Sequence, residues 1–215
     1  MIETVENAIQ FAVVGICCGI SVFCFLRSRS RIWVLMTMCY GSFLLGLLYW
    51  LLYLLFYGVT PQFRYISELS WYTAYLFLFM VLHLIGDPQE RTVRSRIPLL
   101  LIVFAAGMCV LYMFYSSWIS CILSAVCMSL LLYHASRGLI YHRKQNGDAA
   151  RRRFYALTLL FCSAEYFMWT FTCFIWTDTL SNPYFWFDFL QTVCFLLFVP
   201  AAARIERQEK AVAET

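Results

Sequence analysis

Seven long apolar stretches, separated by short polar segments, dominate the pattern of side chains along this chain. A helix needs about 20 mostly apolar residues to cross the hydrocarbon core of a bilayer. The stretches that meet this requirement cover residues 7–26, 32–57, 65–86, 97–115, 118–136, 154–176 and 184–203. With 62% hydrophobic and 13% charged residues, the 215-residue chain is too apolar for a soluble domain. The sequence therefore predicts one all-α integral membrane domain, a seven-transmembrane helix bundle over 1–215, with a short tail at 204–215.

Basic residues fall almost entirely on one side of this seven-helix arrangement. Of the 16 Lys and Arg residues, only Arg64 lies on the other side. The positive-inside rule makes the basic side cytoplasmic, so we expect a multi-pass protein of the cell membrane with its N-terminus outside and its C-terminus inside. The outer side then sets Arg64 against five acidic residues and favours cations. These acidic residues are Glu3, Glu6, Glu68, Asp178 and Asp188.

One acidic residue, Glu165, lies near the centre of the sixth stretch. An ionisable side chain at that depth is costly in hydrocarbon, so it should face the bundle interior and mark a site. The 3.6-residue period of a helix places Trp169 and Trp176 on the same face as Glu165. Thr158, Phe161 and Thr172 share that face. The sixth helix is therefore predicted to have one polar and aromatic side.

The third and seventh stretches supply further acidic and aromatic side chains near the outer mouth. The third opens at Glu68, and helical spacing sets Tyr72 and Tyr75 within a narrow arc of it. The seventh carries Asp188 and Gln191 on or beside one face. Because Trp and Tyr faces attract cations, we expect a small cationic or amphipathic ligand. The predicted ligand-binding residues are Glu165, Glu68, Asp188, Trp169, Tyr72, Tyr75, Trp176 and Gln191. The alternative is that Glu165 serves only to hydrogen-bond neighbouring helices.

The sequence predicts no catalytic group, no cofactor, no metal site and no nucleic-acid partner. All ten cysteines fall inside the predicted spans and no CxxC occurs, which argues against a thiolate metal site. Lys144 and Lys210 are the only lysines, and both lie outside the spans, so a retinal Schiff base is excluded. The zinc-binding histidine pair of alkaline ceramidases is also missing from the last stretch. An intramembrane hydrolase that uses Glu165 or Asp188 is also considered, and it ranks third after the sensor and transporter interpretations given below.

A faint internal repeat is suggested when the two halves are compared at an offset near 121 residues. This offset aligns Thr37 with Thr158 and Ser42 with Ser163. It suggests a 3+1+3 plan in which two three-helix units are joined by the fourth helix. In the first stretch, Gly15 and Gly19 have a small-xxx-small spacing that suits helix packing within the chain or an oligomer.

Two short segments carry a resemblance to a known class of membrane proteins. The segment 67–78, SELSWYTAYLFL, and the segment 187–190, FDFL, resemble the acid-plus-aromatic openings of helices in bacterial seven-helix sensor regions. Those regions precede histidine kinases or cyclic-dinucleotide enzymes. Only a short segment follows Arg204 here, so the resemblance implies a stand-alone sensor or receptor-like module with a separate cytoplasmic signalling partner. The rival interpretation is a small-molecule transporter similar to the SWEET and PnuC families, which share the 3+1+3 plan.

Overall fold

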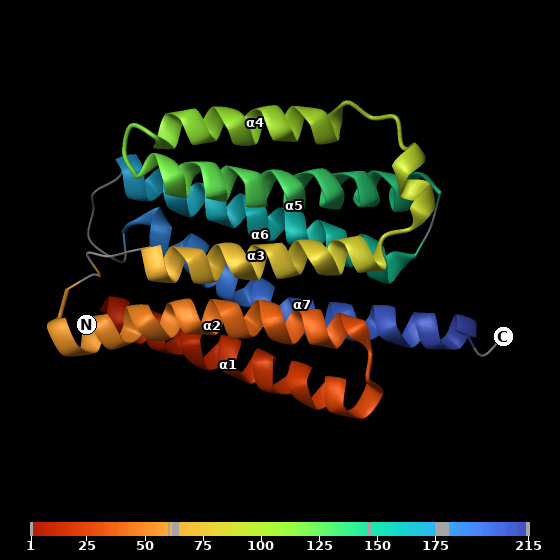
Figure 1. Cartoon of the computed structure of the whole chain (residues 1–215), viewed down its shortest axis with the longest axis horizontal. Helices are drawn as coiled ribbons and strands as arrows, with labels where there is room; N and C mark the ends of the chain where they lie inside the picture. Colours follow the sequence, from red (N-terminus) through yellow and green to blue (C-terminus); the bar gives the residue numbers. More distant parts are fainter. Residues whose placement is uncertain (1, 60, 62–64, 146–147, 175–180, 214–215) are drawn as a thin grey trace.

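Seven α-helices and one short 3-10 helix make up the computed structural model of this chain, which describes residues 2–59, 61, 65–145, 148–174 and 181–213 (Figure 1). The chain reverses direction after each α-helix, so the two termini lie at opposite ends (Figure 1). The helices are α1 (Ile2–Ser28), α2 (Arg31–Tyr57), α3 (Tyr65–Ile85), η1 (Pro88–Thr92), α4 (Ile97–Tyr112), α5 (Trp118–Lys144), α6 (Ala149–Phe174) and α7 (Pro183–Ala213).

Six of the seven α-helices are long and apolar enough to cross a membrane: α1, α2, α3, α5, α6 and α7. The exception, α4, has 16 residues and a length of about 24 Å, against a hydrocarbon core of about 30 Å. It ends at Tyr112, three residues before the predicted boundary, because the chain turns over residues 113–116. A seventh span therefore stays a prediction.

Four helices extend beyond their apolar stretches. Two of them begin five residues early: α1 at Ile2 rather than residue 7, and α6 at Ala149 rather than residue 154. The other two, α5 and α7, end later than expected. The end of α5 is Lys144 rather than residue 136, and α7 continues to Ala213, so the expected tail is helical over 204–213. Both extensions are rich in charged residues, which stop a hydropathy pattern but are good helix formers. Within α7, Pro200 occupies an interior position.

Six helices form a ring around the protein interior, and α4 lies outside it. Neighbouring helices pack in the order α1, α2, α3, α5, α6, α7, and α7 returns to α1. The outermost helix, α4, packs against α5 (Figure 1). The interior is thus enclosed by helices from both halves of the chain.

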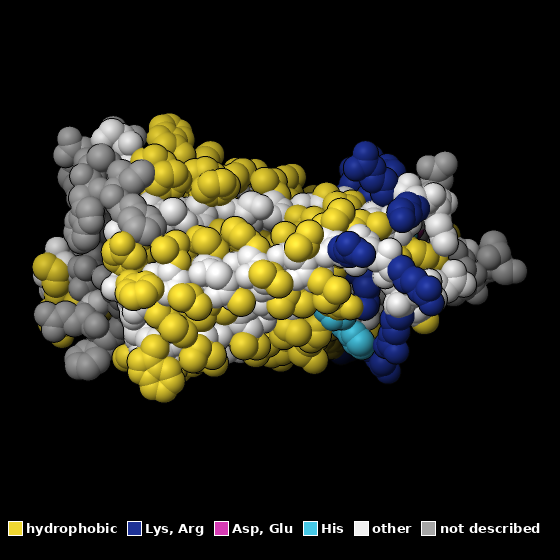
Figure 2. All heavy atoms as spheres, turned by 90° about the horizontal axis from the view of Figure 1, so that it is seen from above, with side chains coloured by type: hydrophobic (Ala, Val, Ile, Leu, Met, Phe, Trp, Pro, Cys, Tyr) yellow, Lys and Arg dark blue, Asp and Glu magenta, His cyan; other side chains and the backbone are white. Residues whose placement is uncertain are grey.

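The outer surface of the bundle is apolar over most of its length and basic at one end (Figure 2). Large apolar side chains point outward, with exposed fractions of 60% for Ile16, 64% for Leu100 and 67% for Val103. A soluble protein rarely exposes a continuous apolar surface of this extent, whereas lipid tails cover one. The fold is therefore that of a multi-pass helical membrane protein.

A cluster of buried aromatic rings fills the middle of the helix ring. The ring of Phe195 lies 4.5 Å from that of Phe43 and 5.4 Å from that of Phe161. Phe198 lies 6.1 Å from Phe161, and the Tyr40 hydroxyl donates a 2.7 Å hydrogen bond to the Phe195 carbonyl oxygen. None of these five side chains is more than 3% exposed. We call this cluster the aromatic floor, because it closes the cavity described next.

The two glycines of the first helix have different surroundings. A Cβ atom at Gly15 would lie 3.8 Å from the Leu44 side chain of α2, so this position packs within the chain. A Cβ atom at Gly19 would meet nothing within 4 Å among the described residues. Association of copies through these glycines stays a prediction.

Candidate functional site

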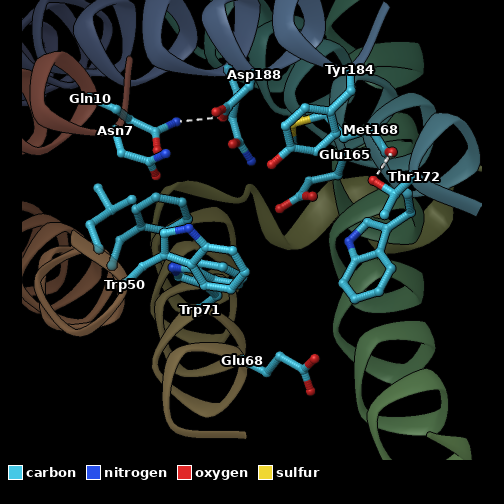
Figure 3. Close-up of a pocket in the computed structure, with 14 residues that line it drawn as sticks. Asn7, Gln10, Trp50, Glu68, Trp71, Glu165, Met168, Thr172, Tyr184 and Asp188 are labelled. Atoms are coloured by element: carbon cyan, nitrogen blue, oxygen red, sulfur yellow. Dashed lines mark hydrogen bonds between the residues drawn. The ribbon is translucent and has the colours of Figure 1, made fainter. Parts of the chain in front are cut away.

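A cavity of about 120 Å³ lies between α1, α2, α3, α6 and α7 (Figure 3). It is at the end of the bundle opposite to the basic end. A single water molecule needs about 10–15 Å³ on the same measure, so there is room for several waters or a small ligand. The residues that line it are Asn7, Gln10, Phe43, Leu47, Trp50, Glu68, Trp71, Glu165, Met168, Trp169, Thr172, Tyr184, Asp188 and Gln191.

Three carboxyl groups from three different helices line this cavity. Glu68 of α3, Glu165 of α6 and Asp188 of α7 are each at most 6% exposed. Asp188 Oδ1 accepts a 2.7 Å hydrogen bond from Gln10 Nε2 (Figure 3). A Glu68 oxygen accepts a short hydrogen bond from the Ser120 hydroxyl of α5. Two of the acids therefore have neutral donors from other helices, which fix their positions.

Glu165 lies between the other two acids and meets neutral polar groups. Gln191, Trp169 and Asp188 line the same cavity as its carboxyl group. Of the described residues that line the cavity, none is Lys, Arg or His. A buried carboxylate is costly without an opposite charge, and no described side chain in the cavity lining supplies one.

Indole rings form one wall of the cavity, opposite Glu165 and Tyr184 (Figure 3). The Trp71 ring lies 5.9 Å from that of Trp50 and stacks on Phe43 at 6.0 Å. Trp71 fits against α2 because residue 46 is glycine: a Cβ atom there would lie 2.6 Å from Trp71 Nε1. The wall therefore depends on one close approach between α2 and α3.

Five of the eight sequence-predicted residues lie together around this cavity: Glu165, Glu68, Asp188, Trp169 and Gln191. Tyr72 instead points toward α5 and donates a 3.2 Å hydrogen bond to the Ser120 carbonyl oxygen. Tyr75 lines a separate space of about 10 Å³, which it shares with Glu165 and Trp169. Trp176 lies outside the described residues. The three acids thus line one cavity, whereas Tyr72 and Tyr75 do not line it.

Other lining residues were not among the predicted ligand contacts, and Trp71 matters most because it carries the indole wall. Helical spacing could have predicted Trp71 at the site, because it follows Glu68 by three residues and so lies on the same helical face. Asn7 and Gln10 lie on a polar face of α1 that the amino-acid pattern also contains. The pattern does not predict that this face packs against α7. The contact is the hydrogen bond from Gln10 to Asp188, which are 178 residues apart in the sequence.

A second buried polar cluster lies at the basic end and was not predicted. Glu90 of η1 is 4% exposed, and its Oε1 atom accepts a 2.8 Å hydrogen bond from the Tyr155 hydroxyl. His142 Nε2 lies 3.1 Å from the same oxygen, and Glu90 also accepts a 3.1 Å bond from the Asp87 amide. These contacts, together with the 2.9 Å bond from Tyr141 to Gln89, join η1 to α5 and α6. We call this group the Glu90 cluster.

The surroundings of Glu90 favour its charged form. Burial on its own raises the pKa of this carboxyl group. Hydrogen bonds from His142, the Asp87 amide and Tyr155, with attraction to the His142 ring, outweigh burial and hold the pKa below its usual value. Glu90 therefore acts as a charged anchor for the connection between α3 and α4.

The described residues contain no group of three or more His, Cys, Asp or Glu side chains that could hold a metal ion. Comparison of the chain with protein-family models, curated proteins and solved structures finds no match.

Proposed function

We propose that this protein binds a small organic cation in the acidic and aromatic cavity and acts as a sensor or receptor-like module. The observation that carries the proposal is the convergence of Glu68, Glu165 and Asp188 on one space with no cationic side chain among its described lining residues. The indole faces of Trp71 and Trp169 would stack on the cation, an interaction worth about 2 kcal/mol where water is excluded.

The ligand would enter from outside the cell. The basic end of the bundle, by the positive-inside rule, faces the cytoplasm of a cell-membrane protein with α4 as a seventh span. The cavity lies at the other end, where the net charge of the sequence is acidic. The apolar sequence of α4 would let it cross with local thinning of the bilayer.

The aromatic floor favours sensing over transport. A transporter must open its site alternately to both sides, and here the buried rings of Phe43, Phe161 and Phe195 separate the cavity from the basic end. A sensor needs only two bundle states that the ligand binds with different affinity. The charged, helical end of α7 offers a surface for a cytoplasmic signalling partner.

Transport is the second candidate, and the packing order of the helices favours it. The order of helices around the ring is the same when α1 is exchanged with α5, α2 with α6 and α3 with α7. In this arrangement α4 lies outside the ring. A 3+1+3 repeat related by an axis along the membrane normal has this property. Uptake of tetramethylammonium into proteoliposomes, above that of empty vesicles, would favour transport over sensing.

Binding is tested with tetramethylammonium and its neutral analogue tert-butanol, by the change in tryptophan fluorescence of the purified chain. We expect saturable binding of the cation alone. The Glu165→Gln variant should bind it about tenfold to a hundredfold more weakly, because a polar contact to a charged group contributes about 1.5–3 kcal/mol. Glu209→Gln, at an exposed position on the far end of α7, is the matched control. Equal binding by the Glu165 and Glu209 variants, or equal responses to both probes, would contradict the proposal.

A further inference from the structure

A second, apolar groove lies on the outside of the helix ring, between α4 and α5. Its volume is about 560 Å³, and its lining is almost entirely apolar. Small side chains at Ala106, Ala125 and Ser129 keep the two helices from filling the space between them. The groove belongs to the surface whose exposed leucines and valines indicate contact with lipid. Its occupant must therefore be compatible with the bilayer interior.

The length of the groove matches one leaflet of a bilayer. Along α5 it extends from Ile122 to Tyr133, a rise of about 16 Å at 1.5 Å per residue. Half of a hydrocarbon core of about 30 Å has nearly the same thickness. On α4 the groove reaches Ile102, five residues from the start of the helix at Ile97. On the basic side, Tyr133 is the last groove residue of α5, one helical turn before Arg137.

A guanidinium group with unused hydrogen-bonding capacity lies at this end of the groove. Arg137, one turn beyond Tyr133, donates a 3.2 Å hydrogen bond to the Tyr133 hydroxyl and lies 5.0 Å from its ring centre. Its Nε atom is buried without a hydrogen-bond partner. Arg137 takes part in none of the ion pairs between described residues. Tyr133, which accepts from Arg137, keeps its own O–H proton for another acceptor.

We propose that the α4–α5 groove binds an anionic phospholipid. One acyl chain lies along Ala106, Ala125 and Ser129, and the phosphate oxygens accept hydrogen bonds from the guanidinium group of Arg137 and from the Tyr133 hydroxyl. Charge complementarity selects the lipid class: Arg137 supplies a cation without a protein carboxylate, and basic pockets between membrane helices on the cytoplasmic side suit anionic headgroups. A zwitterionic lipid carries its own cation and gains less from this site.

The test is native mass spectrometry of the full chain in detergent, titrated with phosphatidylglycerol or phosphatidylcholine of identical acyl chains. We expect tighter binding of phosphatidylglycerol. Removing one basic group near the headgroup should weaken binding about fivefold, so Arg137→Gln should lose that factor for phosphatidylglycerol and little for phosphatidylcholine. Arg143→Gln, at an exposed position on the same helix, is the matched control and should bind as the wild type does.

A second variant keeps the test decisive if the arginine substitution impairs folding. Ala125→Phe fills the groove while leaving Arg137 in place, and it should weaken binding of both lipids. Inorganic phosphate, added as a competitor, should displace neither. Equal affinity for the two lipids in the wild type, equal losses in the Arg137 and Arg143 variants, unchanged binding by Ala125→Phe, or displacement by inorganic phosphate would each overturn the proposal.

Discussion

Replacement of Glu90 by alanine tests whether the Glu90 cluster anchors the connection between α3 and α4. The substitution leaves the Tyr155 hydroxyl and His142 Nε2 buried without their acceptor, on side chains that are 0% and 3% exposed. Removing one partner of a buried charged contact costs about 3–5 kcal/mol. Glu90→Gln keeps the size and one acceptor oxygen but removes the charge, so we expect a smaller loss of about 1–2 kcal/mol.

The measurement is the midpoint of thermal unfolding of the purified chain in detergent. For a chain of this size, the loss expected for Glu90→Ala corresponds to a decrease of about 10 °C. Glu209→Ala removes a carboxylate whose side chain is 43% exposed and whose contact with Arg151 is 3.4 Å long. Exposed pairs of this kind contribute little, so this control should unfold close to the wild-type midpoint. Similar midpoints for the Glu90→Ala and Glu209→Ala variants would refute the anchoring role.

The pH dependence provides an independent check on the charge of Glu90. Its folded-state pKa is lowered, so its contribution to stability is fully present above the unfolded pKa of about 4.3. The contribution is lost as the pH falls through the lower, folded-state value. The difference in midpoint between wild type and Glu90→Gln should therefore persist at neutral pH and close only below about pH 4. A difference that closes on raising the pH would contradict this assignment.

Three further substitutions test the packing around both sites. Gly46→Ala should displace Trp71 from the cavity wall and weaken tetramethylammonium binding in the fluorescence assay, whereas unchanged binding would exclude the indole wall from the site. Gly138→Ala should collide with the Tyr155 ring and cost about 1–3 kcal/mol, measured as a lower unfolding midpoint; a wild-type midpoint would show that the helices can separate freely there. Phe195→Ala should remove the centre of the aromatic floor and lower the free energy of unfolding by about 3 kcal/mol. The control is Phe189→Ala at an exposed position. A smaller loss of stability for Phe195→Ala than for this control would argue against a packed floor.

The helices and the central acid could be predicted from the sequence because both depend on local pattern. Long apolar stretches located the helices, and Glu165 stood out as one acidic residue in such a stretch. The ends of α5 and α7 were set too early, because charged residues end a hydropathy pattern without ending a helix. The length of α4 depends on the turn after Tyr112, for which the apolar pattern gives no signal.

The Glu90 cluster could not be predicted because its contacts join distant parts of the chain. Glu90 meets His142 and Tyr155 across separations of 52 and 65 residues. In the sequence it is one acid among several arginines in a polar connection, which is the usual composition of a solvated loop. Nor does helical periodicity show that Tyr72 turns toward Ser120 rather than into the cavity. Packing between helices determines which way such a side chain points.

The proline in α7 determines where this helix can bend. Pro200 has no N–H group, so the hydrogen bond that would join it to the Leu196 carbonyl oxygen does not form. Asp188 and Gln191 lie on one side of this position, and Glu206, which accepts a 2.7 Å hydrogen bond from Trp33, lies on the other. The turn that contains Pro200 is therefore held by one main-chain hydrogen bond fewer than the other turns of α7, so the helix can bend there at a lower cost than elsewhere along its length.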